Sequence, residues 1–228
     1  MLGYNKKERN MRRMINTLIV SGGDVDERFL TDVYETNKFN YIIAVDGGLR
    51  ILDRLEIIPN YIIGDFDSID KTILNKYINN KNIPIKKLNP EKDYTDTHMA
   101  LKLAIELNSK DITVFGAIGS RIDHTIANIH ILRETLKNNI KCKIIDNKNE
   151  IQLIDRKTKL ELNKNYKYIY LIPFTTTAKG VTLTGFKYPL SNATLEAGQS
   201  IGVSNEQIEK TAYIDLKRGI LILIKSKD

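Results

Sequence analysis

The sequence of 228 residues contains no tryptophan, only one cysteine and only three histidines. The single cysteine, Cys142, cannot form a disulfide within the chain, which is the cysteine usage expected of a protein in a reducing cytoplasm. Because Cys142 lies in the apolar stretch 140–145, we expect it to be a small buried side chain. So few histidines and cysteines also provide no obvious set of zinc ligands.

Long hydrophobic runs are absent as well. The run at residues 220–224 is typical of the longest, and it is far shorter than the roughly 20 residues that span a bilayer. The first 13 residues are charged and are not followed by a long apolar region, so we expect no secretory signal. The sequence therefore predicts no membrane partner and a cytoplasmic location.

Excess charge is concentrated at the N-terminus. The formal net charge is +7, and residues 1–13 account for +4 of it, which leaves +3 for the other 215 residues. We expect residues 1–13 to be a disordered basic extension and the folded part to bind no nucleic acid. A nucleotide-sensing or nucleic-acid-binding module that uses the basic extension is kept as an alternative.

Apolar runs alternate with helical spacing in the first two thirds of the chain. Strands are predicted at residues 15–21, 41–45, 61–63, 83–88, 111–115 and 141–146. Helices are predicted at residues 26–36, 49–55 and 69–77, and again after residues 92 and 121. This alternation predicts an α/β domain at residues 14–147, with a mostly parallel, Rossmann-like sheet and flanking helices.

The pattern changes near residue 149. Short alternating runs follow at residues 150–154, 159–162, 166–173, 181–186, 200–203, 211–216 and 219–225. Six or seven short strands separated by turn signals predict a small all-β sandwich or barrel at residues 148–228.

Carboxylates follow two of the predicted parallel strands. Asp46 follows the strand 41–45, and Asp65 and Asp67 follow the strand that ends at Gly64. The carboxyl ends of parallel strands form the crevice in which such sheets bind ligands. Two aspartates one residue apart can share a Mg²⁺ ion that takes its other ligands from water and phosphates. Taken singly, each motif could also be a polar turn that caps the next helix.

Two further polar motifs stand where helices are predicted to begin. They are Lys92, Asp93, Thr95 and Asp96, and then Gly116, Gly119, Ser120, Arg121, Asp123 and His124. Helix capping by Asp93 or Thr95 explains only part of the first set. A glycine-bearing loop at a helix N-terminus, with Arg121 beside it, is suited to binding an anion. The chain has no G-x-x-x-x-G-K-[ST] motif, so it is not a P-loop enzyme.

Several carboxylates on one edge repel each other unless cations neutralise them. Mg²⁺ with a polyphosphate nucleotide satisfies this arrangement. A haloacid-dehalogenase-like phosphatase with Asp65 as nucleophile is an alternative, because that class also places Asp-x-Asp after an apolar strand. The additional acidic motifs and the all-β C-terminal part fit that alternative poorly.

The motifs in this order resemble the thiamine pyrophosphokinase (thiamine diphosphokinase) family. The resemblance rests on DGG at 46–48, GDFDS at 64–68, KDYTD at 92–96, the G-x-x-G-x-R-x-D-H-x-x-x-N motif at 116–128 and VSNE at 203–206. It implies Mg²⁺-dependent transfer of the pyrophosphoryl group of ATP to the hydroxyl of thiamine, which gives thiamine diphosphate and AMP. It also implies a nucleotide-binding α/β domain, a thiamine-binding β-sandwich, and a homodimer with active sites at the subunit interface.

The resemblance also implies residue roles. Asp46, Asp65, Asp67 and Asp96 would be catalytic, and the last three would hold Mg²⁺. ATP would be held by Lys92, Asp93, Thr95, Gly116, Gly119, Ser120, Arg121, Asp123 and His124. Thiamine would be bound by Asp46, Ser204 and Asn205. The chain departs from the family at Ser120, where many members have glycine, and in lacking the tryptophan that some members place against thiamine.

Overall fold

The computed structural model describes residues 14–67, 69–79, 82–88 and 93–228. The predicted basic extension 1–13 and the predicted ATP ligand Lys92 lie outside the described residues.

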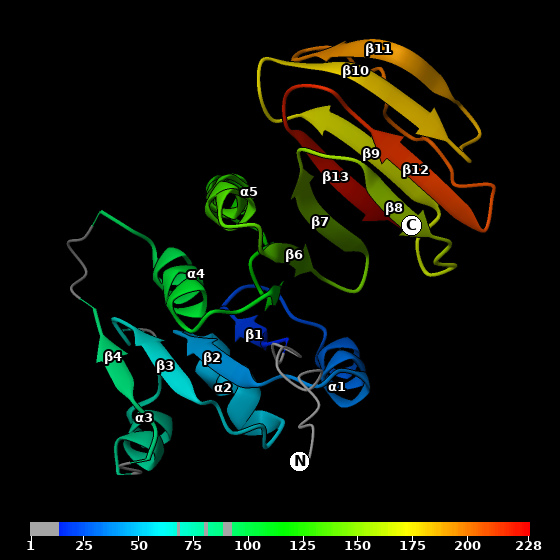
Figure 1. Ribbon diagram of the computed structural model, residues 1–228. Helices are drawn as coiled ribbons and strands as arrows, with labels where there is room; N and C mark the ends of the chain where they lie inside the picture. Colours follow the sequence, from blue (N-terminus) through cyan, green and yellow to red (C-terminus); the bar gives the residue numbers. More distant parts are fainter. Residues whose placement is uncertain (1–13, 68, 80–81, 89–92) are drawn as a thin grey trace, which may run out of the picture.

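The first part of the chain forms a parallel sheet with helices on both faces (Figure 1). Its elements are β1 (Asn16–Val20), α1 (Glu27–Thr36), β2 (Tyr41–Val45), α2 (Gly48–Arg54), β3 (Tyr61–Gly64), α3 (Lys71–Ile78), β4 (Ile85–Lys87), α4 (Asp96–Glu106), β5 (Asp111–Phe115), α5 (Ile122–Lys137) and β6 (Lys141–Ile145). The strands follow the order β4-β3-β2-β1-β5-β6, and every pairing among them is parallel. This arrangement confirms the predicted α/β fold class.

The strands are apolar on both faces because helices cover both faces. On β1, Leu18 and Val20 belong to one hydrophobic cluster, which also contains Leu30 of α1 and Leu52 of α2. Ile19, between them, belongs to a second cluster that includes residues of α4 and α5. The crossovers place β2, β3 and β4 on one side of β1, and β5 and β6 on the other. The direction of winding therefore reverses between β1 and β5, which is where doubly wound sheets bind ligands.

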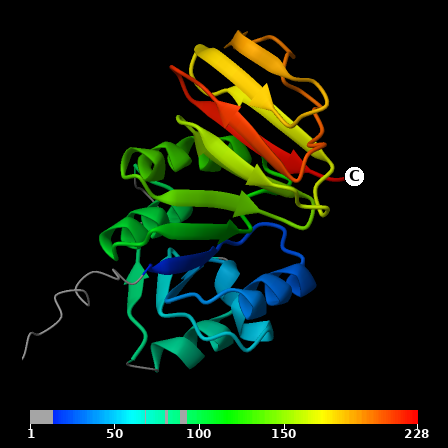
Figure 2. The same cartoon turned by 45° about the vertical axis from the view of Figure 1, so that its right-hand side comes forward.

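The second part of the chain forms the predicted β-sandwich (Figure 2). Its strands are β7 (Asn149–Ile154), β8 (Thr158–Glu161), β9 (Tyr168–Pro173), β10 (Thr177–Thr184), β11 (Leu190–Glu196), β12 (Thr211–Asp215) and β13 (Leu221–Ser226). β7, β13 and β9 extend the large sheet to nine strands, and the other four form a second sheet in the order β11-β10-β12-β8. A cluster that includes Leu171 and Leu223 of the large sheet and Ile214 of the small sheet joins the two layers.

Two local predictions in the sandwich are wrong. Residues 200–203 were expected to be a strand, but they form a turn in which the Val203 N–H donates to the Ser200 carbonyl at 3.2 Å. Gly202 makes this turn possible, since its φ of +91° lies in a region that side-chain-bearing residues rarely adopt. β11 was not predicted, because most of its residues are exposed and no clean alternation of buried and exposed positions marks it.

The expected domain division at residue 147 falls in the turn between β6 and β7. Asp146 closes this turn by accepting hydrogen bonds from the N–H groups of Lys148 and Asn149, at 2.8 and 2.6 Å. Beyond the turn, β7 pairs antiparallel with β6, so the large sheet continues without a break into the sandwich. The two parts therefore share backbone hydrogen bonds as well as side-chain packing.

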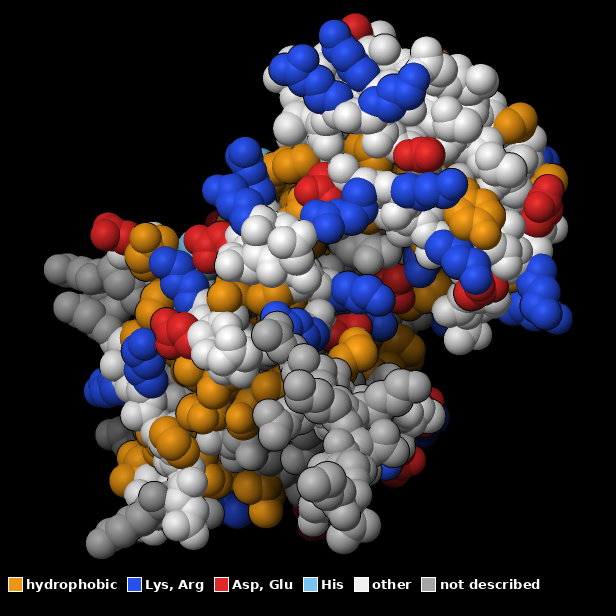
Figure 3. All heavy atoms as spheres, viewed as in Figure 1, with side chains coloured by type: hydrophobic (Ala, Val, Ile, Leu, Met, Phe, Trp, Pro, Cys, Tyr) orange, Lys and Arg blue, Asp and Glu red, His pale blue; other side chains and the backbone are white. Residues whose placement is uncertain are grey.

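Lysine and arginine side chains do not gather in one stripe on the face shown in Figure 3. They are interspersed with acidic side chains over both parts of the molecule. This distribution suits the near-neutral charge of the chain beyond its first 13 residues. It does not resemble the continuous basic track expected of a nucleic-acid-binding surface.

One ion-pair network lies where the large sheet passes into the sandwich. Glu150 of β7 lies 2.6 Å from the ammonium of Lys225 on β13 and 3.9 Å from that of Lys143 on β6. The side chains of Glu150 and Lys225 are only 13% and 16% exposed. Loss of this carboxylate would leave the poorly solvated ammonium of Lys225 without its partner.

We therefore expect Glu150→Gln to lower the free energy of unfolding by about 2 kcal/mol, the scale of a hydrogen bond to a charged group. Glu161→Gln is the matched control, because Glu161 pairs with Lys159 at the same 2.6 Å but is 60% exposed. The control should leave the urea midpoint close to that of wild type. Urea unfolding measures both variants, and equal shifts of the two midpoints would contradict a special role for the buried network.

Candidate active site

Three loops meet at the carboxyl ends of β1, β2 and β5, and their glycines allow the close approach. A Cβ added to Gly22 would lie 3.1 Å from Cα of Gly47, and one added to Gly116 would lie 2.2 Å from the carbonyl oxygen of Ser21. Gly23 donates its N–H to the Gly116 carbonyl at 3.0 Å. Gly116 also has a φ of +66°. A side chain in place of Gly23 or Gly116 would force the loops apart, so glycine is required at these two positions for the loops to meet.

Asp46 links the ends of two strands to the start of α4. Its Oδ1 accepts the N–H of Asp65 at 3.1 Å, and its carboxylate also accepts the N–H of Phe66. Its side chain is within hydrogen-bonding reach of the Asp96 side chain. Burial, together with the negative charges of Asp96 and Asp65, raises the pKa of Asp46 to about 7. The structure thus brings together three of the four predicted catalytic carboxylates.

The turn that carries Asp65 and Asp67 is held in an unusual conformation. Phe66, between them, has a φ of +65°, which is rare for a bulky residue, while its ring is buried in the core beneath the sheet. Asp65 Oδ1 accepts the N–H of Asp67 at 3.1 Å. Burial of the Phe66 ring therefore fixes the turn, with Asp67 exposed to solvent and Asp65 partly buried beside Asp46.

α4 begins at the third acidic motif. Thr95 is its N-cap and accepts the His98 N–H at 3.2 Å. Asp96 is the first residue of the helix, where its negative charge interacts favourably with the helix dipole. Asp93 precedes the cap and is exposed. Thr95 thus has a capping role, and Asp96 lies in the carboxylate group.

The loop from β5 to α5 is held by hydrogen bonds to side chains of α5, and several of its own side chains are exposed. The buried Asn128 donates to the Ala117 carbonyl at 2.8 Å, and the Gly119 N–H donates to Thr125 Oγ1 at 3.3 Å. Arg121 forms a two-point ion pair with Asp123, at 2.6 and 3.3 Å. This contact lowers the pKa of Asp123. Ser120, Arg121, Asp123 and His124 are all exposed, so they are open to a ligand.

The two predicted thiamine ligands lie in the sandwich. Asn205 is buried, and its Oδ1 accepts the N–H groups of Tyr188 and Glu206, at 3.0 and 2.9 Å. Its Nδ2 donates to the Tyr188 carbonyl at 2.7 Å. Ser204 is exposed and has a φ of +57°. Asn205 therefore stabilises the turn on which Ser204 is exposed. The sequence did not predict this role, because no motif marks its partner, Tyr188.

The donor chemistry of the carboxylate group suits Mg²⁺. Within the described residues, no set of three or more Asp, Glu, His or Cys side chains is arranged to hold a metal ion by itself. Mg²⁺ does not require such a set, because it usually binds one or two carboxylates and takes its other ligands from water and substrate phosphates. Burial and the negative charges of Asp96 and Asp65 together raise the pKa of Asp46, and a divalent cation would relieve the repulsion among these charges.

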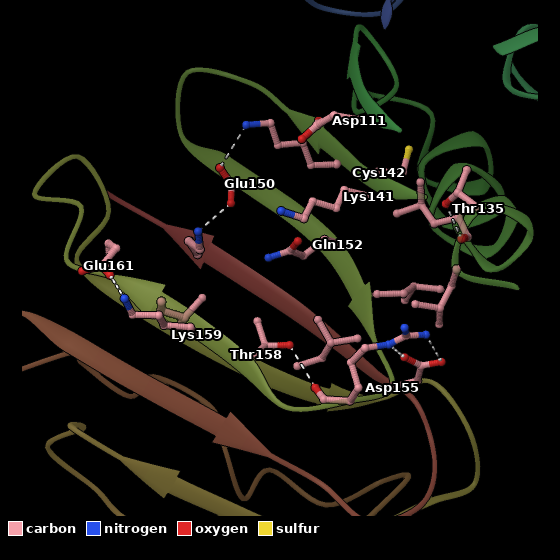
Figure 4. A pocket seen from close by; sticks show the side chains of 18 of the residues that line it. Asp111, Thr135, Lys141, Cys142, Glu150, Gln152, Asp155, Thr158, Lys159 and Glu161 are labelled. Atoms are coloured by element: carbon pink, nitrogen blue, oxygen red, sulfur yellow. Dashed lines mark hydrogen bonds and ion pairs between the residues drawn. The ribbon is translucent and has the colours of Figure 1, made fainter. Parts of the chain in front are cut away.

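A cavity of about 970 Å³ lies away from these carboxylates (Figure 4). Its lining includes Asp111 and Lys141, the first residues of β5 and β6, so it lies toward the opposite ends of the strands. Glu150 pairs with two of its lysines. Cys142 also lines it, but burial raises the pKa of this thiol to about 12, so it is not a reactive nucleophile. The cavity adds nothing to the candidate active site.

Comparisons with known proteins agree on one family. Two family models match: "Thiamin pyrophosphokinase, catalytic domain" at residues 34–144, and "Thiamin pyrophosphokinase, vitamin B1 binding domain" at residues 156–221. The chain is 38% identical to the thiamine pyrophosphokinase of Bacillus subtilis over 194 residues, which cover 85% of this chain and 90% of that protein. It is 28% identical to thiamin pyrophosphokinase 1 of Caenorhabditis elegans over 83% of this chain and 80% of that protein.

Solved structures show the same fold. The crystal structure of the Bacillus subtilis thiamine pyrophosphokinase superposes with a TM-score of 0.86 at 36% identity, over 93% of this chain and 99% of that chain. The yeast thiamin pyrophosphokinase structure, at only 18% identity, superposes with a TM-score of 0.76 over 94% of this chain and 87% of that chain. The α/β domain and the sandwich thus occur together in these structures.

The raised pKa of Asp46 predicts a pH trend in metal-free buffer. The unfolded chain loses this proton near the ordinary value of 3.8, whereas the folded protein keeps it up to about 7. The contribution of Asp46 to stability must therefore fall as the pH rises between these values. Asp46→Asn should gain stability relative to wild type over this range in urea unfolding. Asp53→Asn is the control, because Lys76 lowers the pKa of Asp53 and its contribution is lost only at lower pH. If the difference in free energy of unfolding between Asp46→Asn and wild type did not change with pH, the raised pKa would be contradicted.

Proposed function

This chain belongs to the thiamine pyrophosphokinase family, and we propose that the carboxylates after β2 and β3 and at the start of α4 form its magnesium and phosphate site. The activity of the family is transfer of the pyrophosphoryl group of ATP to the hydroxyl of thiamine, which gives thiamine diphosphate and AMP. The phosphatase with Asp65 as nucleophile and the nucleic-acid-binding module have no support among these relatives.

The observation that carries the proposal is the convergence of Asp46, Asp65 and Asp96. Their mutual repulsion favours binding of a divalent cation, which would in turn bind a polyphosphate. Asp65, Asp67 and Asp96 would hold Mg²⁺, which neutralises phosphate charge when bound. Asp46 already accepts two backbone N–H groups of the Asp65–Asp67 turn, so its first role is to orient that turn.

The loop before α5 is the proposed site for the ATP phosphates. Its glycines expose backbone N–H groups near a helix N-terminus, and this end of a helix favours anions. Arg121 can exchange its ion pair with the exposed Asp123 for one with a phosphate. Asp93 and Thr95 would contact ATP from the start of α4, on the other side of the carboxylates.

The reaction places simple demands on these groups. The thiamine hydroxyl oxygen forms a bond to the β-phosphorus, the bond from that phosphorus to the oxygen bridging the α- and β-phosphates breaks, and AMP leaves with that oxygen. Most catalysis of such transfers comes from alignment and charge neutralisation. Clustered carboxylates with bound Mg²⁺, an arginine and a helix N-terminus provide both.

We propose that two copies of the chain complete each site. Ser204 is exposed on a turn of the sandwich, and large apolar side chains near it are exposed too: Ile201, Val203 and Ile208 are near in sequence, and Tyr188 is bonded to the turn through Asn205. Apolar side chains gathered on a surface in this way favour contact with a partner. A homodimer that sets this turn against the carboxylates of the other copy would bury them and bring Ser204 to thiamine.

We also propose that the protein is located in the cytoplasm. This proposal is supported by the lone cysteine, which is buried and forms no disulfide. None of the described helices is long and apolar enough to cross a membrane.

Asp67→Asn and Asp96→Asn should each lower kcat for AMP formation by at least ~100-fold, the scale of losing one preorganised electrostatic contact. Thermal unfolding should change little, because Asp67 is exposed and Asp96 lies at a helix end. Asp155→Asn removes a carboxylate that pairs with Arg156 in the sandwich, and it should keep wild-type kcat. Wild-type rates of the two site variants at saturating Mg²⁺ would refute their assignment.

The shared-site proposal predicts complementation between inactive chains. Asp67→Asn disables the carboxylates, and Ser204→Trp blocks the sandwich turn. Co-expressed in equal amounts, the two chains should recover about one quarter of wild-type specific activity, because half of the dimers are mixed and each contains one intact site. No recovery from purified mixed dimers would place both residues in the same subunit's site and refute the proposal.

A further inference from the structure

Ser21 and Thr97 form a hydroxyl pair at the edge of the carboxylate site. Ser21 directly follows β1, and its Oγ lies 3.0 Å from Oγ1 of Thr97, the second residue of α4. Ser21 is only 4% exposed. The pair joins residues 76 positions apart in the chain, and neither residue belongs to the sites described above.

The backbone of Ser21 contacts the third part of the site. Its N–H donates to the Phe115 carbonyl at 2.9 Å, and its own carbonyl oxygen faces Gly116, where any Cβ would lie 2.2 Å away. Ser21 therefore contacts both the start of α4, which carries Asp96, and the loop that leads to Arg121. The hydroxyl pair is the side-chain part of this junction.

Apart from the approach of Asp96 to Asp46, the buried contact between α4 and the sheet is a cluster of apolar side chains. Ala100, Leu101 and Ala104 of α4 share a cluster with Ile19 of β1 and other sheet residues. Apolar contacts are non-directional, so they set the rotation of the helix and its position along its own axis less sharply than a hydrogen bond does. A hydrogen bond depends on both distance and angle. The Ser21–Thr97 bond at the first turn is thus suited to fix where Asp96 points.

We propose that Ser21 and Thr97 are positioning residues, which hold Asp96 and the start of α4 in register with β1 and the loop before α5. This inference rests on the proposed role of Asp96 in the active site. Neither residue of the pair contacts the substrate directly in this proposal. Loss of the bond would leave the fold intact and allow the first turn of α4 to shift relative to Asp46 and Asp65.

A second hydroxyl pair on β1 provides the control. Thr17 Oγ1 lies 2.6 Å from Ser109 Oγ, and both residues are fully buried. Thr17 lies near the start of β1, about 13 Å along the strand from Ser21 at roughly 3.3 Å per residue. The two pairs share the same chemistry, and one residue of each lies on β1 or directly after it, but only one pair lies beside the carboxylates.

The experiment compares Ser21→Ala, Thr97→Val and their double variant with Thr17→Val, Ser109→Ala and their double variant. Each site variant should lower kcat about tenfold to a hundredfold, as small misplacements of reacting groups do. The double variant should be no slower than the slower single variant, because both changes break one bond. Thr97→Ser, which keeps the hydroxyl, should restore wild-type kcat. The control variants should lower the melting temperature at least as much and leave kcat unchanged.

Amide exchange provides a readout that needs no substrate. The His98 N–H, bonded to Thr95 Oγ1 in the first turn of α4, should exchange faster in Thr97→Val and at the wild-type rate in Thr17→Val. Unchanged exchange in Thr97→Val, additive losses of kcat, or equal losses in the two pairs would overturn the proposal. A failure of the proposed function would look different, since Asp96→Asn would then keep full activity whatever the exchange rates show.

Discussion

The repulsion among carboxylates at one edge of the sheet is the constraint on which the rest of the site depends. Asp46, Asp65 and Asp96 come from three separate elements, and burial together with the negative charges of Asp96 and Asp65 raises the pKa of Asp46 to about 7. An arrangement of this kind opposes folding unless other interactions hold it in place. Those interactions are the apolar packing on both faces of the sheet, the helix cap at Thr95 and the burial of the Phe66 ring.

Two residues of the carboxylate group have backbone conformations that residues with side chains rarely adopt. Asp46 and Phe66 both have positive φ, at 43° and 65°, and both lie within the carboxylate group. A Cβ on Gly64 would lie 1.8 Å from Asp46 Oδ1, so the chain has no room for a side chain there. Unfavourable conformations persist at functional sites when the surrounding structure determines them. Here the surrounding structure also keeps the acids together, in the place where a cation and a polyphosphate would be bound.

Much of this was predictable from the sequence, because the signals are local. Apolar runs that end in acids or glycines predicted the parallel strands and the carboxylates after them, and the change in pattern near residue 149 predicted the sandwich. Contacts between distant residues were not predictable. The buried role of Asn205 depends on residue 188, and the bond between Ser21 and Thr97 depends on how α4 lies on β1. Strand β11 was missed because its mostly exposed residues leave no pattern.

The central claim, that these acids accept a polyphosphate only together with a divalent cation, can be measured directly. Calorimetric titration of the protein with a non-hydrolysable ATP analogue, with and without Mg²⁺, separates binding from turnover. The account predicts clear binding with Mg²⁺ and much weaker binding without it, and Asp65→Asn should reduce the difference. Equal affinity in the two buffers would contradict the account, because the clustered acids would then have no electrostatic role in binding the nucleotide.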